Sequence, residues 1–468
     1  MIAATVIGSG VAMLTGTVVN VALPAIGEDL GASVSDLQWI VNGYLLTLAA
    51  LILIGGSLGD RFGRRRVYLV GVAAFTIANL LCAIAPTVGW LVAARVAAGA
   101  GGALLVPGSL AILQSSFHPD DRSTAIGAWS GLTGIAVAIG PPLGGFLVDS
   151  VGWRWIFALP LPLALAVLAI APRHVPESRD VQAAGRVDAV GGALAVVGLG
   201  GLIYPMIVAS DRDLGLVDWS IGVLGLLALA GFVVAERCQR HPMLPPGVFA
   251  DRQFTAANLV TFAVYGALGA VFFLLVVHLQ TVVGLSATAA GMAALPVTAI
   301  MLVLSAPGGR LAQRIGPRRP LTVGPVVIAG AMLLMGGIGQ DAGYWTDVFP
   351  SVVVFGLGLS LIVAPVTATA LAAVPDRHSG IASGVNNAVS RAAQLIAVAS
   401  LPALAGIGGA DYSDPEAFGA GFSRAMAIAA GVAVVGGVIA WFTISDDVLS
   451  EDAPEPTFHC GAESTPIR

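Results

Sequence analysis

Fourteen apolar stretches, each long enough to cross a lipid bilayer as a helix, constrain the fold of this chain more than any other feature. A spanning helix needs about 20 mostly apolar residues for a hydrocarbon core of about 30 Å. Of the 468 residues, 57% are hydrophobic and 10% are charged, whereas soluble domains carry roughly 25% charged residues. The excess apolar surface must therefore face lipid. The predicted spans are residues 3–26, 37–58, 66–86, 88–116, 122–148, 153–172, 188–208, 219–235, 255–280, 287–308, 319–340, 347–373, 379–407 and 421–443.

The arginines predict how these spans are oriented. All 22 basic residues are Arg, and most of them fall on every second loop. Positively charged loops stay in the cytoplasm, so the sequence predicts a multi-pass protein of the cell (cytoplasmic) membrane with both termini in the cytoplasm. The absence of Lys also excludes a P-loop ATPase, whose phosphate-binding motif requires that residue.

An internal repeat divides the chain. Residues 55–66 read GGSLGDRFGRRR and residues 308–319 read GGRLAQRIGPRR. Both segments follow an even-numbered span, so the two copies run in the same direction. The sequence therefore predicts an all-α membrane protein of two parallel six-helix bundles with a two-helix insert, an architecture in which transporters bind substrate between the halves. The predicted divisions are a first bundle at 1–173, a cytoplasmic segment with the insert at 174–236, a linker with the second bundle at 237–445, and a disordered cytoplasmic tail at 446–468.

Two motifs resemble signatures of the major facilitator superfamily, and more closely of its fourteen-span drug:proton antiporter branch. Residues 56–66 match the loop pattern G-x-L-x-D-R-x-G-R-R-R, and residues 140–145 match the G-P-x-x-G-G element associated with exporters. Residues 19–24, 38–39 and 153–157 also fit that branch. The resemblance implies a secondary exporter of a lipophilic or amphipathic small molecule, such as a drug, antibiotic or secondary metabolite. It also implies alternating access and proton antiport.

Two departures from the branch leave an alternative open. An acidic residue usually stands at the position of Thr15, and Gln usually stands at that of Ala98. No Asp or Glu lies well inside any predicted span. The chain could therefore be a facilitator, or a carrier that is not coupled to protons. An alternative of another class is a non-transporting membrane receptor or scaffold, although the chain shows no soluble sensing domain.

The first group of candidate residues is a conformational latch in the loop at residues 56–66. Its carboxylate can interact with a helix dipole, and its guanidinium groups can pair with lipid or with neighbouring acids. The competing interpretation is that these arginines only fix the topology. The residues are Gly56, Asp60, Arg61, Gly63, Arg64 and Arg65.

The second group concerns coupling and the cavity. A cation inside a span is costly, so Arg95 is expected to face a cavity or a partner, and the family links this Arg to proton transfer; the competing interpretation is an Arg that reaches the interface. Asn387, Arg391 and Gln394 share one helix face, where substrate contact and helix–helix bonding are both open. Thr15, Arg95 and Arg391 are the coupling and cavity candidates. The substrate-cavity candidates are Asn20, Gln38, Asn42, Tyr44, Tyr265, Asn387 and Gln394.

The third group is the exporter element Gly140, Pro141, Gly144 and Gly145. Proline removes backbone donors and bends a helix, whereas glycine permits close helix contact. In the family this element implies a seal against leak. No catalytic motif, cofactor or metal site is expected, so the chain is not expected to be an enzyme. The expected partners are a small-molecule substrate, a proton and the lipid bilayer; no nucleic acid is expected, and a monomer is favoured.

Overall fold

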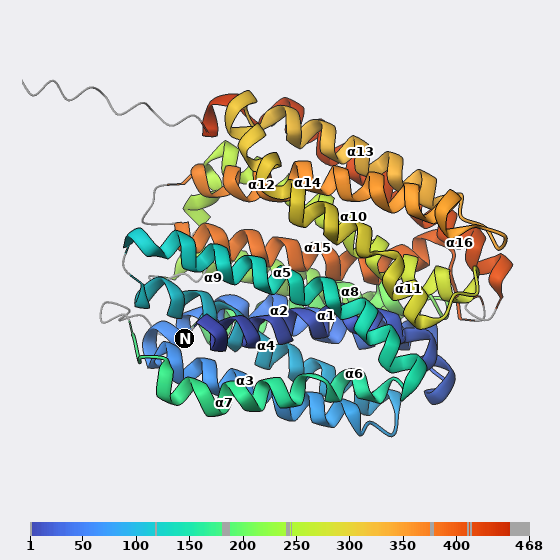
Figure 1. The fold of residues 1–468 in the computed structure, drawn as a ribbon, viewed down its shortest axis with the longest axis horizontal. Coiled ribbons are helices and arrows are strands. Elements are labelled where there is room, and N and C mark those ends of the chain that lie inside the picture. The colour runs from blue at the N-terminus through green and yellow to red at the C-terminus, as the bar shows by residue number, and fades with distance from the viewer. Residues whose placement is uncertain are drawn as a thin grey trace, which may run out of the picture.

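The computed structural model describes residues 2–117, 119–179, 188–239, 244, 246–374, 379–409, 411 and 414–449, with the backbone alone for 119–128, 130 and 379–381. Within these residues the chain has no strands and fourteen helical segments long and apolar enough to cross a membrane (Figure 1). The predicted fold class of fourteen spans is confirmed. The helices of the first half are α1 (Ile2–Leu30), α2 (Val34–Phe62), α3 (Arg64–Ala83), α4 (Val88–Ser116), α5 (Pro119–Ser150), α6 (Arg154–Ala158) and α7 (Pro160–His174).

The remaining helices form the insert and the second half. Helix α11 continues into α12, as α6 does into α7, and the π-helical turn η2 (Tyr344–Val348) leads into α14. Short 3-10 turns η1 (Pro246–Ala250) and η5 (Asp446–Leu449) precede and follow the second bundle. These helices are α8 (Ala189–Val208), α9 (Leu216–Cys238), α10 (Arg252–Thr281), α11 (Ala287–Ala293), α12 (Leu295–Ile315), α13 (Arg318–Gly336), α14 (Phe349–Ala372), α15 (Ser379–Ala405) and α16 (Pro415–Thr443).

Local sequence signals set the ends of α2. Ser33 caps its first turn, because the Ser33 side chain accepts a hydrogen bond from the Asp36 amide while the Asp36 carboxylate accepts one from the Ser33 amide. This capping box satisfies two of the free amide groups at a helix start. At the other end Gly63 adopts φ +108°, a conformation that favours glycine and ends the helix. Helix α2 therefore extends beyond the predicted span at 37–58.

The helices form two bundles that meet along two seams. In the first bundle α4 packs on α2 and α3, and α1 packs on α5; in the second, α13 packs on α14 and α16, and α10 packs on α15 and α16. The bundles contact each other where α2 meets α15 and where α5 meets α11, with α1 and α10 also in contact. Any movement of one bundle relative to the other must therefore change the packing at these seams.

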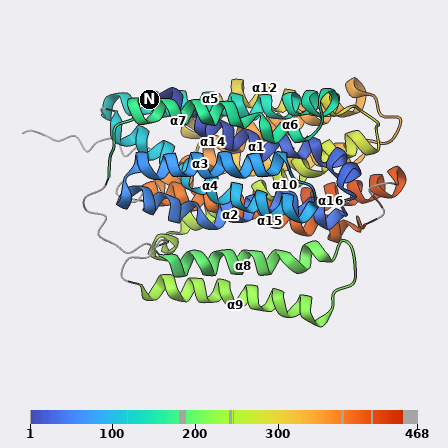
Figure 2. The ribbon, with the colours of Figure 1, turned by 90° about the horizontal axis from the view of Figure 1, so that it is seen from below.

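The two-helix insert lies against one of the seams. Helices α8 and α9 pair with each other outside the main body (Figure 2), and α8 contacts both α2 and α15. The Trp39 and Tyr204 rings are 6.3 Å apart between α2 and α8. Beyond the end of α8, Asp211 accepts a hydrogen bond from the Ser35 amide at 3.4 Å. The insert thus covers the α2–α15 seam and touches both bundles.

The duplicated loops adopt the same local structure in both bundles. Gly63 and Gly316 have φ +108° and +83°, and each follows an even-numbered span, so both lie at the same end of the molecule. Glu177 accepts a hydrogen bond from the Arg65 amide at 3.1 Å, and Asp446 accepts one from the Arg318 amide at 3.3 Å. Each carboxylate follows the sixth span of its own half. The repeat seen in the sequence is therefore a repeat in three dimensions.

We call the end that carries Gly63 and Gly316 the glycine-loop end, and the opposite end, where α5 finishes at Ser150, the Asp149 end. The predicted disordered tail begins at 446, but Asp446–Leu449 form η5 and Asp446 contacts the glycine-loop end. The rest of that predicted tail, 450–468, lies outside the described residues.

Candidate transport site

A cavity of about 190 Å³ lies between the two bundles. Helices α1, α2 and α5 form one wall, and α10 and α15 form the other. Most of its surface is apolar, and one cationic side chain projects into it from α15. The lining residues are Met13, Gly16, Thr17, Asn20, Val41, Leu45, Val137, Leu268, Gly269, Phe272, Phe273, Arg391, Gln394 and Val398.

Three of the predicted cavity and coupling residues line this cavity. Asn20 comes from α1, whereas Arg391 and Gln394 come from α15. The Oδ1 atom of Asn20 is buried without a hydrogen-bond partner among the described residues. Arg391 Nη2 lies 3.2 Å from the Met13 sulfur across the gap between the halves. The structure therefore brings these three polar side chains together around one space.

The other cavity candidates lie next to the cavity or farther from it. Gln38 donates hydrogen bonds to the carbonyls of Val398 and Ala399, at 2.7 and 3.1 Å, and so joins α2 to α15 in the seam. Asn42 and Tyr44 are buried within the first bundle, where Tyr44 donates a hydrogen bond to the Ala12 carbonyl at 2.9 Å. Two further candidates, on α10 and α15, are half-buried outside the lining: Tyr265 and Asn387.

Thr15 is buried on α1, outside the cavity lining. Its hydroxyl donates a hydrogen bond to the Val11 carbonyl of the same helix at 2.8 Å. The neighbouring residues Gly16 and Thr17 do line the cavity. The position at which the branch usually has an acid therefore holds a hydroxyl bonded to its own helix.

Arg95 lies fully buried inside the first bundle. Its Nε donates a hydrogen bond to the Ile40 carbonyl at 3.0 Å. Its guanidinium carbon is 4.4 Å from the Tyr44 ring centroid and 6.0 Å from that of Phe157, and Nη1 and Nη2 have no hydrogen-bond partner among the described residues. Aromatic faces thus surround this cation, away from the cavity lining and from lipid.

The exporter element makes α5 the helix that both bundles share. A Cβ atom on Gly144 would lie 2.2 Å from Val18 Cγ2, and one on Gly140 would lie 2.9 Å from Thr17 Oγ1, so these glycines allow close packing on α1. On the other bundle, a Cβ on Gly145 would lie 2.3 Å from the Ala287 carbonyl oxygen. Pro141 faces α11 as well, with its carbonyl oxygen 2.3 Å from where a Cβ on Gly291 would be.

Polar contacts reinforce this seam at the Asp149 end. The Asp149 carboxylate accepts hydrogen bonds from the amides of Ala287 and Thr288, at 3.2 and 2.8 Å, and from the Thr288 hydroxyl at 2.6 Å. On the neighbouring helices, Gln280 donates a hydrogen bond to the Val21 carbonyl at 3.0 Å. Asp149 and Gln280 are not among the residues predicted from the sequence. A signal for Asp149 was an acid at the end of a span next to the exporter element.

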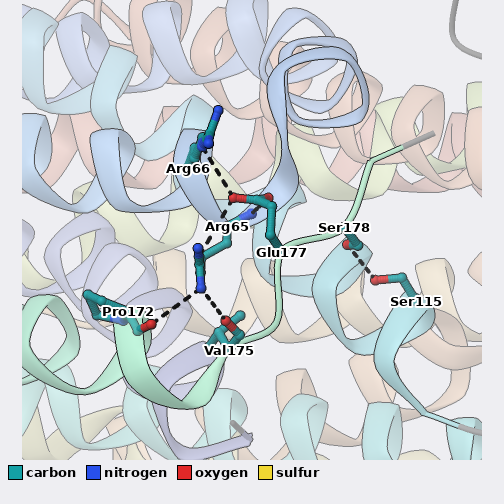
Figure 3. A network of polar contacts seen from close by, with 7 residues as sticks. All are labelled: Arg65, Arg66, Ser115, Pro172, Val175, Glu177 and Ser178. Atoms are coloured by element: carbon teal, nitrogen blue, oxygen red, sulfur yellow. Dashed lines mark hydrogen bonds and ion pairs between the residues drawn. The ribbon is translucent and has the colours of Figure 1, made fainter. Parts of the chain in front are cut away.

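Several predicted latch residues make polar contacts at the glycine-loop end, and Figure 3 shows those around Arg65. Arg64 Nε donates a hydrogen bond to Asp60 at 2.8 Å. Arg65 donates to the carbonyls of Pro172 and Val175, at 3.3 and 3.1 Å. Glu177, which is not among the residues predicted from the sequence, lies 3.6 Å from Arg65 and 3.7 Å from Arg66. These partners lie in the first bundle or in the segment that directly follows α7.

The remaining latch residues pack around this network. Gly56 lies on α2 opposite Pro107, whose Cβ would be 3.8 Å from a Cβ on Gly56. The Arg61 guanidinium carbon is 5.1 Å from the Phe62 ring centroid. A Cβ on Gly63 would be 2.6 Å from Glu177 Oε1, so glycine lets the carboxylate approach the loop backbone.

Direct polar contacts between the two bundles are unevenly distributed. Among the described residues, the hydrogen bonds that join the bundles lie at the level of the cavity or between the cavity and the Asp149 end. The structure therefore has its two halves closed together at the Asp149 end.

Comparisons with known proteins agree with this architecture. A family model described as Major Facilitator Superfamily matches residues 5–398 and 257–462. The puromycin resistance protein pur8 of Streptomyces alboniger is 33% identical, over 97% of this chain and 92% of that protein. The tetracenomycin C resistance and export protein of Streptomyces glaucescens is 33% identical, over 86% and 74%. The multidrug efflux pump LfrA of Mycolicibacterium smegmatis is 33% identical, over 82% and 76%.

Solved structures share the fold. A D-xylose-proton symporter matches with a TM-score of 0.64 at 15% identity, over 95% of this chain and 97% of that one. A bacterial homolog of the human lysosomal transporter Spinster matches with a TM-score of 0.66 at 18% identity, over 94% and 96%. The resemblance seen in the sequence motifs is therefore confirmed, and the chain belongs to the major facilitator superfamily of membrane transporters.

Proposed function

We propose that this chain exports a lipophilic or amphipathic small molecule, such as a drug, antibiotic or secondary metabolite, by alternating access. The observation that carries the proposal is the mostly apolar cavity between two repeated bundles that are closed together at one end. Rocking the bundles would open the cavity to one side and then to the other. The export and resistance proteins among its relatives support the same cargo class.

A resistance screen in an efflux-deficient bacterial host tests this proposal. Expression of the chain is expected to raise the inhibitory concentration of at least one amphipathic compound in a broad panel. Immunoblotting of the membrane fraction controls for abundance. Unchanged inhibitory concentrations across the panel at normal membrane abundance would contradict the proposal.

The arginine distribution supports a proposed orientation for this multi-pass protein. The glycine-loop end carries Arg64, Arg65 and Arg66 on one repeat and Arg314 and Arg318 on the other. We place this end, together with both termini, on the cytoplasmic side of the cell membrane. We also propose a monomer, divided into bundles at 1–173 and 237–445 around the insert.

The geometry of the site favours the alternative to proton antiport, which is a facilitator or a carrier that is not coupled to protons. Proton antiport is expected from the resemblance, but no Asp or Glu is found among the described residues that line the cavity, and the Thr15 hydroxyl bonds to its own helix. A side chain that carries protons must change its charge within the working pH range. The site therefore supports a carrier that is not coupled to protons through a cavity carboxylate.

Proteoliposomes with a pH gradient distinguish the two modes. In the wild type, we expect counterflow of substrate with less than about a twofold response to a gradient of about one pH unit. Thr15→Asp is expected to make counterflow respond severalfold to the pH gradient, because it places a titratable group beside the cavity. Thr15→Asn, which adds no titratable group, is expected to behave as the wild type. Net accumulation by the wild type when a pH gradient is the only gradient present would establish proton coupling and refute this expectation.

We propose that the loop network acts as a latch on the conformational cycle. Asp60 and Arg64 form a partly exposed pair, and exposed pairs contribute at most about 1 kcal/mol to stability. Asp60→Ala is therefore expected to leave thermal stability nearly unchanged and to lower the transport rate about tenfold. Asp341→Ala, an exposed acid on the loop after α13, is the matched control. Normal transport by Asp60→Ala at normal membrane abundance would contradict the latch, and the loop would then serve only to fix the membrane topology.

A further inference from the structure

We propose that the cavity selects amphipathic anions, and that the membrane potential drives their export. The inference rests on the proposed export function and adds the charge of the cargo and the energy source. Its starting point is the charge of the lining: Arg391 is cationic, and the described residues that line the cavity include no Asp or Glu. A cationic cargo would therefore meet a like charge.

The contacts of Arg391 leave its charge available to a ligand. Nη2 lies 3.2 Å from the Met13 sulfur, and a thioether is a weak acceptor. Arg391 has no ion pair with a carboxylate among the described residues. A guanidinium in a water-poor site binds an anionic acceptor much more strongly than a neutral one.

The rest of the lining fits an apolar body attached to that anion. Phe272, Phe273 and Leu268 present aromatic and aliphatic surface from α10. On the facing wall, Asn20 adds a neutral polar side chain to the lining. The cavity thus suits a compact aromatic acid, with its anionic group at Arg391 and its ring system on the phenylalanines.

An anionic cargo also supplies the missing energy source. The interior of a cell is electrically negative, so an anion that leaves moves down the electrical gradient. For a monovalent anion, about 60 mV of potential supports a tenfold concentration ratio. Export of this kind requires no proton-carrying side chain, which agrees with a hydroxyl at Thr15 and with a lining that lacks carboxylates.

Two probes with the same ring and opposite permanent charges test the inference. The full-length chain is reconstituted into liposomes, and uptake of 2-naphthalenesulfonate and of 2-naphthyltrimethylammonium is measured. Potassium gradients with valinomycin set the potential, and pH gradients are imposed separately. The variants are Arg391→Gln, Arg391→Glu and Arg391→Lys. The control is Arg173→Gln, which removes a charge from the exposed last turn of α7.

The expected result is at least tenfold faster uptake of the sulfonate than of the ammonium probe. Sulfonate should accumulate about tenfold per 60 mV of inside-positive potential and should not respond to the pH gradient. Arg391→Gln should lower sulfonate uptake at least tenfold, Arg391→Glu should reverse the preference, and Arg391→Lys should retain it. Arg173→Gln should behave as the wild type.

Each other outcome overturns a defined part of the proposal. Equal or faster uptake of the ammonium probe, or an unchanged preference in Arg391→Gln, overturns the selection of anions while the export function stands. Sulfonate accumulation that follows the pH gradient overturns the potential as the driving force. Uptake of neither probe, together with no resistance in the efflux-deficient host, overturns the export function itself.

Discussion

Replacement of Gly145 by valine is expected to lower transport at least tenfold. Gly145 lies on α5 where it meets the second bundle, and a Cβ atom there would be 2.3 Å from the Ala287 carbonyl oxygen. Carbon and oxygen cannot approach so closely, and packed helices deform little, so the two bundles would have to separate at the Asp149 end. The carrier would then fail to close that end, and the cycle would stop.

The same helix supplies a matched control for this substitution. Gly134 on α5 has no neighbouring atom within 4 Å of the position of its Cβ, so Gly134→Val changes helix propensity by a similar amount without a clash. Transport of a resistance substrate in cells, normalised to membrane abundance, should be close to wild type for Gly134→Val. Equal transport by the two variants would show that contact between α5 and α11 is not required.

Replacement of Arg95 by methionine is expected to abolish most transport without loss of thermal stability. Arg95 is fully buried, and two of its nitrogens lack hydrogen-bond partners among the described residues. Substitution of buried ionic groups by apolar residues of similar volume is often neutral or stabilising by about 1–4 kcal/mol. Contacts with the Tyr44 and Phe157 rings offset part of the cost of burial. Because burial of the Arg95 guanidinium costs desolvation free energy, we expect that this residue is needed for the transport cycle and not for stability.

Thermal unfolding in detergent and transport in proteoliposomes check this prediction together. The melting temperature of Arg95→Met should equal or exceed that of the wild type, while the transport rate should fall at least tenfold. Arg154→Met is the comparison, because it removes an exposed arginine that pairs with Asp29 at 2.7 Å. A lower melting temperature with intact transport for Arg95→Met would assign the residue a structural role only.

The sequence was sufficient to predict the architecture, because lipid imposes a simple rule on it. Each span must hide its backbone polar groups in a helix and present an apolar surface, so length and hydropathy identified the fourteen spans that the described part of the chain contains. The repeat of residues 55–66 at 308–319 was recognisable because the same backbone turn occurs twice, at Gly63 and Gly316. Spacing along α15 likewise placed Arg391 and Gln394 on one face, and both line the cavity.

The contacts between distant segments could not be derived in this way. Glu177 and Asp446 each follow a sixth span, and only the folded bundle brings them to the duplicated loops. The Asp149 carboxylate accepts a hydrogen bond from the Thr288 amide at the start of α11, across the seam between the bundles. Hydropathy carries no information about which distant residues meet in this way. The sequence placed Arg95 inside a span. Whether its side chain points toward Tyr44 depends on how α4 is rotated about its own axis relative to α2, which the sequence alone does not give. The positions of the helices could therefore be predicted from the sequence, whereas the contacts between side chains of different helices could not.

Distances between paired spin labels at the two ends of the molecule test alternating access most directly. In a background without Cys82, Cys238 and Cys460, one pair is placed at Gln114 and Ala372, on α4 and α14 at the glycine-loop end. A second pair is placed at Ser150 and Val283, on the two sides of the seam at the Asp149 end. Addition of a transported substrate should shorten the first distance while the second lengthens. Two distances that stay constant, or that change in the same direction, would contradict a carrier whose halves rock around a central cavity.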